Sequence, residues 1–291
     1  MKPFKKPAYM LKNTGRAHPL WAQLILFAGL FFLMAFAEAV ALLILYTFFP
    51  AAEAGPGAAD LYCKAGSALA VYVFARALEK QSREQLSLRV PKKSTFFTEY
   101  MTGLVSGGAV FALAVLFGVI AGAMSVAPGT EKVTPGTLAL YFFGFCLQSF
   151  QEELLCRGYI LGTLVKRCSL PAAVLLSALF FAALHLFNAG ISFIAFLNLL
   201  LFGVLTALLT LRRGSIWAAA GLHAGWNFLQ GNIFGSAVSG LSLGPSVFAV
   251  AFAPEKALLN GGSFGPEGGL AVTLTLCLGI GFVLFGMEQK S

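Results

Sequence analysis

Long apolar runs alternate with short polar segments along this chain. Each run holds about 18 residues or more, enough for a helix to cross a hydrocarbon core about 30 Å thick. Backbone groups in lipid must be satisfied within each segment, and the alternating pattern of a β-barrel is absent. We therefore predict an all-α, polytopic membrane bundle of about eight transmembrane helices. The runs lie near residues 20–49, 61–78, 101–126, 137–156, 171–188, 191–211, 214–234 and 270–287.

The composition of the chain also indicates a membrane location. Hydrophobic residues make up 58% of it and charged residues 11%, whereas soluble domains carry about 25% charged residues. The first apolar run is about 30 residues long, which exceeds the apolar region of a secretory signal, so we expect a retained anchor. The expected organisation is a basic cytoplasmic tail over residues 1–19 and a single integral-membrane domain over residues 20–291.

Basic residues predict how the chain lies in the membrane. Most of the 20 Lys and Arg residues fall in the amino-terminal tail and in alternate loops, and basic loops stay on the cytoplasmic side. Both termini are therefore predicted to be cytoplasmic, and Arg157 is assigned to one of the inner loops. Attraction to anionic membrane lipid accounts for the net charge of +8, so no nucleic-acid partner is expected.

Two adjacent carboxylates and an arginine interrupt an otherwise apolar region. Glu152, Glu153 and Arg157 lie in the run QEELLCRG. An ionisable group at the bilayer centre costs about 2.5–3.5 kcal/mol, so several of them in one membrane region imply a polar cavity. In a helix, Glu153 and Arg157 share a face and can pair, whereas Glu152 is turned away by about 100°. We predict one structural carboxylate and one free carboxylate.

Two further motifs follow in the same region. FAALH carries Phe181 and His185, and HAGWN carries His223 and Asn227. Each pair is four residues apart and is expected to share a helix face. A cavity that received these groups together with Glu152 would hold a potential base, a second titratable group and two donors able to stabilise an oxyanion. These are the parts of a peptide hydrolase that activates water.

Other interpretations of the same residues stay open. A metallopeptidase could bind zinc through His185, His223 and a carboxylate, although HExxH is absent. Covalent catalysis could use Cys156 or Ser149. A non-catalytic transporter, scaffold or immunity factor could use the cluster for binding, although no convincing pair of inverted repeats is visible. The favoured interpretation, in which a carboxylate activates water, requires no metal or other cofactor.

The three motifs together resemble those of a known family, the CAAX-processing and bacteriocin-processing intramembrane proteases, also called the CPBP or ABI family. The family signature is EExxxR, then FxxxH, then HxxxN or HxxxD, on successive membrane helices. Their order and separations here are also similar to the family's, over a protease-like core at about residues 137–235. The matching residues are Glu152, Glu153 and Arg157, then Phe181 and His185, then His223 and Asn227.

The resemblance implies a glutamate-dependent endopeptidase and a role for each motif. Glu152 and His185 would activate water, and His223 and Asn227 would form the oxyanion hole. Glu153 and Arg157 would support the site, in agreement with the helical geometry. Phe181 is assigned with them as a supporting residue, although an aromatic residue at such a position is more often part of the core.

The implied substrate is a peptide or a lipidated protein. A prenylated CaaX peptide, a bacteriocin or signalling leader peptide and a membrane-protein segment are all compatible with the resemblance. The charge-derived topology places Glu152 toward the cytoplasmic end of its span and His185 deeper in the next one. These groups can meet only around a hydrated pocket formed by a long, tilted or broken helix. We expect this pocket to open to the cytoplasm.

Features outside the three motifs carry weaker expectations. Glu38, in the first apolar run, is expected to face a cavity or to link helices without taking part in catalysis. Glycines four residues apart allow close helix packing in membranes. Such pairs occur at Gly103 and Gly107, Gly118 and Gly122, and Gly221 and Gly225.

Overall fold

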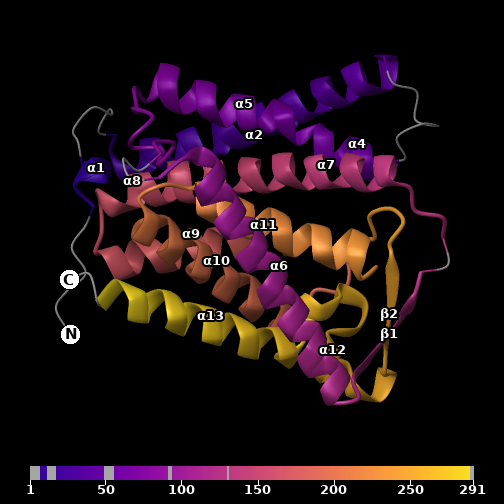
Figure 1. The fold of residues 1–291 in the computed structure, drawn as a ribbon. Helices are drawn as coiled ribbons and strands as arrows, with labels where there is room; N and C mark the ends of the chain where they lie inside the picture. Colours follow the sequence, from indigo (N-terminus) through magenta and orange to yellow (C-terminus); the bar gives the residue numbers. More distant parts are fainter. Residues whose placement is uncertain (1–6, 12–17, 49–55, 91–93, 130, 289–291) are drawn as a thin grey trace.

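The computed structural model describes residues 7–11, 18–48, 56–90, 94–129 and 131–288. The fold is a bundle of helices with one short two-stranded sheet (Figure 1). The helices of the bundle are α2 (Leu20–Phe48), α4 (Pro56–Tyr62), α5 (Lys64–Val73), α6 (Phe96–Ile120), α7 (Pro135–Glu153), α9 (Leu170–Ala183), α10 (Phe193–Arg213), α11 (Trp217–Phe228) and α13 (Leu270–Glu288).

Shorter elements connect and extend these helices. Three π-helical turns continue α5, α7 and α11, and three 3₁₀ turns lie between β2 and α13. The short α-helices are α1 (Ala8–Leu11), α8 (Leu161–Val165) and α12 (Ala257–Asn260), and the strands are β1 (Met124–Pro128) and β2 (Phe248–Phe252). The π-helical turns are Phe74–Leu78, Leu154–Ile160 and Leu229–Ile233, and the 3₁₀ turns are Pro254–Lys256, Gly262–Phe264 and Pro266–Gly268.

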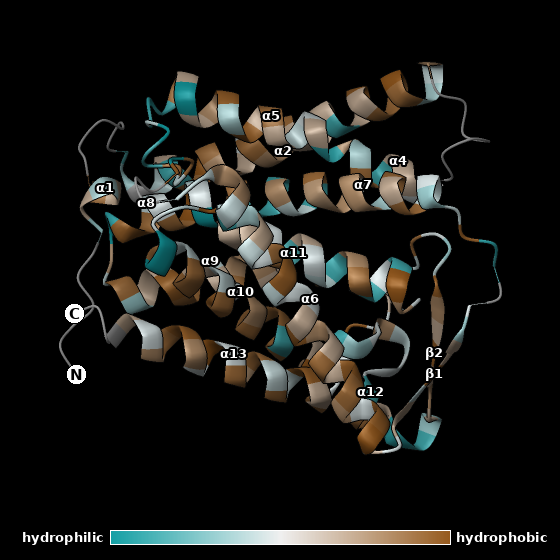
Figure 2. Cartoon of the chain, in the orientation of Figure 1, coloured by the Kyte–Doolittle hydropathy of each residue, from teal (hydrophilic) through white to brown (hydrophobic). Residues whose placement is uncertain are grey.

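The predicted fold class, a helical membrane bundle, is confirmed. Among the described residues, five helices are long and apolar enough to cross a membrane. Large apolar side chains on the outer helices are exposed, including Phe32 at 78% and Phe282 at 72%. Hydrophobic colour dominates α2, α6 and α13 in Figure 2. These side chains are suited to contact with lipid.

The predicted number of eight spans is not confirmed. All eight apolar runs contain helix, but α7, α9 and α11 are not among the five candidate spans of the described chain. Helix α9 is only 14 residues long. Helices α7 and α11 carry the polar motif residues, which lower their hydropathy. The departures from the predicted count therefore fall on the three helices that carry the motifs.

Most of the basic residues that the structure describes lie at one end of the bundle, with Lys64, Lys132 and Lys256 as exceptions. Arg213, at the end of α10, pairs with Glu99 near the start of α6 at 2.7 Å. Arg167, after α8, donates to the backbone oxygen of His18 at 2.7 Å, just before α2. The strands β1 and β2 lie at the opposite end (Figure 1). The basic positions Lys2, Lys5, Lys6, Lys12, Arg16, Lys92, Lys93 and Lys290 lie outside the described residues.

The assignment of Arg157 to an inner loop is wrong. This residue lies in the π-helical turn after α7, and its side chain is fully buried. An acidic partner one turn away holds its positive charge inside the bundle. The i, i+4 spacing with Glu153 supplies that partner.

The strands are an element that the apolar pattern did not predict. β1 and β2 pair antiparallel from Met124 opposite Phe252 to Pro128 opposite Phe248. The segment around Val247–Ala253 is apolar but too short to cross a bilayer. Its backbone groups instead bond to a strand more than 100 residues earlier, a pairing that local periodicity cannot reveal.

Glycines bring helices α6 and α11 into backbone contact. A Cβ atom added at Gly103 or Gly107 of α6 would overlap the carbonyl oxygens of Ala218 and Leu222, and the converse holds for Gly221 and Gly225 against α6. The close packing expected for these two pairs is confirmed. Gly118 and Gly122 differ, because Gly118 packs against the side chain of Met124, and Gly122 has a φ of +63° in the turn after α6.

The glycines of α11 also determine which way the motif residues of this helix point. His223 and Asn227 each follow a glycine by two residues, so they point to the side of the helix away from α6.

We expect Gly225→Ala to push α11 away from α6 and to lower the free energy of unfolding by about 1–3 kcal/mol, because the added Cβ would overlap the backbone of α6. Thermal unfolding in detergent measures the loss. Gly281→Ala on α13 is the matched control, because nothing lies within 4 Å of its added Cβ. Equal stability of the two variants would contradict this packing.

Candidate active site

Glu152 and Glu153 end helix α7, and the helix changes its winding directly after them. Thr134 caps the start of α7 by accepting a hydrogen bond from the backbone of Thr137 at 3.1 Å. The π-helical turn Leu154–Ile160 then follows Glu153 without a break in the helical path. A π-helical turn shifts the directions of the side chains around it and is frequent at functional sites. The two carboxylates consequently point to different partners.

Glu153 is held in the interior by an ion pair. Its Oε2 lies 3.1 Å from Nε of Arg157, and both side chains are fully buried. The guanidinium also donates to the carbonyl oxygen of Gly203 at 3.2 Å and to the hydroxyl of Thr206, and it stacks over the Phe181 ring with 4.6 Å to the centroid. The predicted pairing of Glu153 with Arg157 is confirmed.

Glu153 also contacts a histidine that the sequence had not linked to it. Its Oε1 lies 3.1 Å from Nδ1 of His223. Because a carboxylate can only accept, the proton must sit on Nδ1 of the imidazole. The opposite ring atom, Nε2, lies 3.8 Å from Oε2 of Glu152. Glu153 therefore fixes the ring orientation of His223, with its second nitrogen toward Glu152.

Glu152 is joined to Asn227 through a glutamine that the motifs do not include. Nε2 of Gln148 donates to Oε1 of Glu152 at 2.5 Å. Oε1 of Gln148 accepts from Nδ2 of Asn227 at 3.1 Å. The other carboxylate oxygen, Oε2 of Glu152, is buried and has no hydrogen-bond partner. The free carboxylate predicted at Glu152 is therefore hydrogen-bonded at one oxygen and has no hydrogen bond at the other.

His185 enters the site from the turn that follows α9. Its Nδ1 lies 3.0 Å from the carbonyl oxygen of Phe181, and the two rings are 5.0 Å apart. If Nδ1 carries the proton, Nε2 of the neutral ring is an acceptor. The expected one-turn relation between Phe181 and His185 is confirmed, although the helix ends at Ala183, before the histidine.

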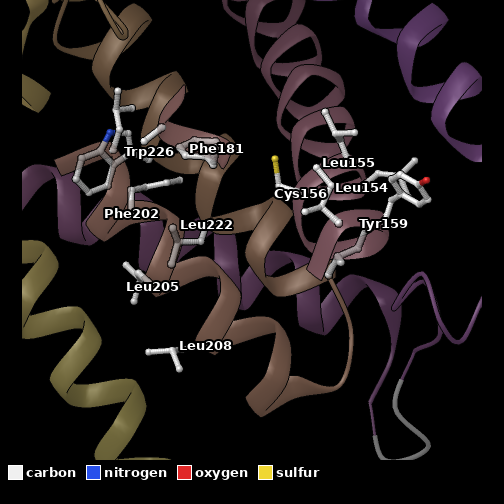
Figure 3. Close-up of a cluster of buried hydrophobic side chains, with 14 of the residues drawn as sticks. Leu154, Leu155, Cys156, Tyr159, Phe181, Phe202, Leu205, Leu208, Leu222 and Trp226 are labelled. Carbon is white, nitrogen blue, oxygen red and sulfur yellow. The ribbon is translucent and has the colours of Figure 1, made fainter. Parts of the chain in front are cut away.

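Aromatic rings form an apolar support beneath the imidazoles. Phe202 lies 5.0 Å from the ring of His223 and 5.4 Å from that of Trp226. Phe181 stacks on Phe202 at 5.8 Å. Figure 3 shows these three aromatic side chains lying together in the buried cluster. Their packing restricts the orientation of the histidines on one side.

One cavity brings the predicted catalytic residues together. Its volume is about 660 Å³, and Glu152, His185, His223 and Asn227 all line it. Phe181 lines it too, whereas Glu153 and Arg157 lie behind the wall. Much of the remaining lining is apolar. Apolar side chains in this lining include Met34, Leu42, Leu61, Leu155, Leu184, Leu199, Leu241 and Leu243.

A second ion pair lines the same cavity. Glu38 of α2 and Lys64 of α5 are 2.8 Å apart, and their side chains are 23% and 29% exposed. The expectation that Glu38 faces a cavity or links helices is confirmed in both respects. Lys64 begins helix α5 and forms part of the cavity wall.

The loop that follows α11 covers one side of the cavity. Ser239 lies in it, and Glu267 holds this residue by accepting from its backbone nitrogen at 2.5 Å and its hydroxyl at 3.0 Å. Asn188 donates to the carbonyl oxygen of Ser239 at 2.8 Å. This loop belongs to the end of the bundle that carries β1 and β2, away from the basic residues (Figure 1). The cavity is predicted to open at the basic, cytoplasmic end. The wall residues of this loop belong to the opposite end of the bundle.

The residues considered for covalent catalysis are poorly placed for it. Cys156 is fully buried beside Leu154 and Leu155 in the apolar cluster (Figure 3) and does not line the cavity. Ser149 is also fully buried, and its hydroxyl donates to Oε1 of Gln148 at 3.2 Å. Neither hydroxyl nor thiol has a basic partner in a geometry that would activate it.

A metal centre would need three ligands directed at one point. Within the described parts of the chain, no group of three or more His, Cys, Asp and Glu side chains is arranged to hold a metal ion. Glu153 bonds to His223 and Arg157, and Asn227 bonds to Gln148. Two donors of the zinc interpretation, the Nδ1 atoms of His223 and His185, are therefore engaged in other contacts, whereas Oε2 of Glu152 has no hydrogen-bond partner.

The fold and the site define an integral membrane protein with a polar cavity inside its helical bundle. Comparison with protein families adds that a model described as type II CAAX prenyl endopeptidase Rce1-like matches residues 134–229. This segment begins at the cap of α7, ends just after α11 and contains every residue of the three motifs. The resemblance to the CAAX-processing proteases is confirmed over this third of the chain. At the family level, the segment is similar to that of a CAAX-type endopeptidase. A search of curated proteins found no match to the chain.

Proposed function

We propose that this protein is an intramembrane endopeptidase that hydrolyses a peptide bond with water activated by Glu152. The observation that carries the proposal is one cavity lined by Glu152, His185, His223 and Asn227, in which Oε2 of Glu152 has no hydrogen-bond partner and lies 3.8 Å from Nε2 of His223. A carboxylate anchored at one oxygen can present the other to a water molecule. The match to the type II CAAX prenyl endopeptidase model supports the same reaction class.

In the proposed reaction, Glu152 acts first as a base and then as an acid. It takes a proton from water as the water oxygen attacks the carbonyl carbon of the substrate. His185 assists, because its Nε2 is free to accept a proton while Nδ1 is bonded to Phe181. The tetrahedral intermediate collapses as the C–N bond breaks, and the proton passes to the leaving amine.

His223 and Asn227 would stabilise the oxyanion of that intermediate. Asn227 has two N–H donors, of which Gln148 engages one. His223 can donate from Nε2 only as a cation, since its other N–H bonds to Glu153. Its ring lies between two carboxylates, with Glu153 at 3.1 Å and Glu152 at 3.8 Å. Donors fixed before the reaction stabilise developing charge at little reorganisation cost.

The proposed substrate is a membrane-associated peptide with a lipidated or apolar segment. The family description names prenylated CaaX substrates for the matched proteins. The cavity here combines a polar site with an apolar lining that could hold a lipid chain or apolar side chains. We also propose that residues 20–291 form one membrane domain and that its basic end, with both termini, faces the cytoplasm.

Metal-independence separates this proposal from a zinc peptidase. We expect purified active protein to keep its peptidase activity after extensive chelation, because Glu152 and the histidines provide the base and donors without a Lewis acid. Elemental analysis should give far less than one zinc per chain. Stoichiometric zinc that leaves together with activity, and restores activity when added back, would establish the metallopeptidase instead.

A further inference from the structure

Three polar side chains in the cavity form a chain of hydrogen bonds with a defined direction. Glu152 and Gln148 lie one turn apart on α7, and Asn227 reaches them from α11. The contacts are 2.5 Å from Gln148 to Glu152 and 3.1 Å from Asn227 to Gln148. The glutamine is therefore the only residue in this chain of bonds that touches both of the others.

The direction of the chain follows from the charge at one end. An ionised carboxylate has no proton to donate, so Gln148 must turn its NH₂ group toward Glu152. Its carbonyl oxygen then faces Asn227 and must receive a donor. Asn227 meets this requirement by presenting its NH₂ group, and Ser149 adds a second donor to the same oxygen at 3.2 Å.

We propose that Gln148 is a positioning residue. The carboxylate of Glu152 orients the amide of Gln148, and the carbonyl oxygen of Gln148 in turn orients the NH₂ group of Asn227 toward the oxyanion. Without Gln148, the amide of Asn227 can rotate and present its oxygen, which would repel the oxyanion. The inference rests on the proposed function, because it assigns a task within that reaction. It also explains why a glutamine that is absent from the three motifs stands one turn before Glu152.

The test uses Gln148→Met, which keeps the length of the side chain and removes its hydrogen bonds to Glu152 and Asn227. Peptide cleavage by the purified protein in detergent should show kcat lowered by about 10- to 100-fold, the usual range for a lost orienting partner. KM should stay close to the wild-type value, since Gln148 acts through other side chains. Gln148→Glu, which keeps the shape but replaces the NH₂ donor by an acceptor, should lose activity in the same way and serves if the first variant does not fold.

A double-mutant cycle distinguishes positioning from a merely structural role. Asn227→Ala alone should lower kcat by about 100-fold or more, the range for a lost oxyanion donor. Combined with Gln148→Met, the loss should be much smaller than the product of the two single losses, because both changes disable the same amide. Phe143→Leu changes an exposed position on the same helix that does not line the cavity, and it should keep wild-type kcat.

Three results would overturn the inference: wild-type kcat in Gln148→Met, multiplicative losses in the double variant, or an equal loss in Phe143→Leu. Its failure is separable from that of the proposed function. Glu152→Gln in the same assay tests the function, so an inactive Glu152→Gln beside a fully active Gln148→Met would remove only the role of Gln148.

Discussion

Replacing Glu152 with Gln is expected to lower kcat for peptide cleavage by about 10²- to 10⁴-fold, the contribution of a general base or acid. Gln has the size of Glu but cannot take a proton from water. The fold should be retained, because the fully buried ion pair behind the cavity is formed by Glu153 and Arg157 and does not involve Glu152. Steady-state kinetics and thermal unfolding of the same purified sample measure both quantities.

Glu38→Gln is the matched control for this change. Glu38 is also a carboxylate on the wall of the cavity, but it pairs with Lys64 and has no contact with the histidines that would make it a base. The variant should keep most of the wild-type turnover. If Glu38→Gln lost turnover and Glu152→Gln kept it, the result would identify Glu38, and not Glu152, as the base.

Replacing Arg157 with Leu is expected to lower the free energy of unfolding by about 3–5 kcal/mol, the usual cost of leaving one partner of a buried ion pair alone. Arg157 is fully buried, and its loss would leave the buried carboxylate of Glu153 without its cationic partner and with only the contact to His223. Chemical or thermal unfolding in detergent should show the change, together with a lower yield of folded protein.

A second variant separates stability from orientation at this position. Arg157→Leu combined with Glu153→Gln removes the charge as well as its partner, so part of the lost stability should return. Activity should not return to the wild-type level, because Glu153 also holds Nδ1 of His223. An Arg157→Leu protein as stable as the wild type would show that the buried pair contributes nothing to the fold.

The sequence was sufficient to predict the groups that meet in the cavity. Four-residue spacing predicted the pairing of Glu153 with Arg157 and the relation of Phe181 to His185, and the structure contains both. It also separated Glu153 from Glu152. These relations are local, so helical geometry alone determines them.

The contacts between helices could not be predicted in the same way. The bonds from Glu153 to His223 and from Asn227 to Gln148 each join residues 70 or more positions apart. Gln148 carries one local signal, its place one turn before Glu152, but an amide at that spacing has many possible partners. The π-helical turn after Glu153 shifts the directions of the side chains on the helix. No periodic pattern in the sequence predicts this turn.

The most direct measurement of the central claim is the mass of the products formed by purified protein in lipid vesicles. The assay uses prenylated CaaX peptides, their unprenylated forms and leader peptides, with a chelator present and with Glu152→Ala protein in parallel. The account predicts that the wild-type protein cleaves at least one of these membrane-associated peptides at a single bond. It predicts no cleavage by folded Glu152→Ala protein. The same product from both proteins, or no product from well-folded wild-type protein on any of the peptides, would contradict it.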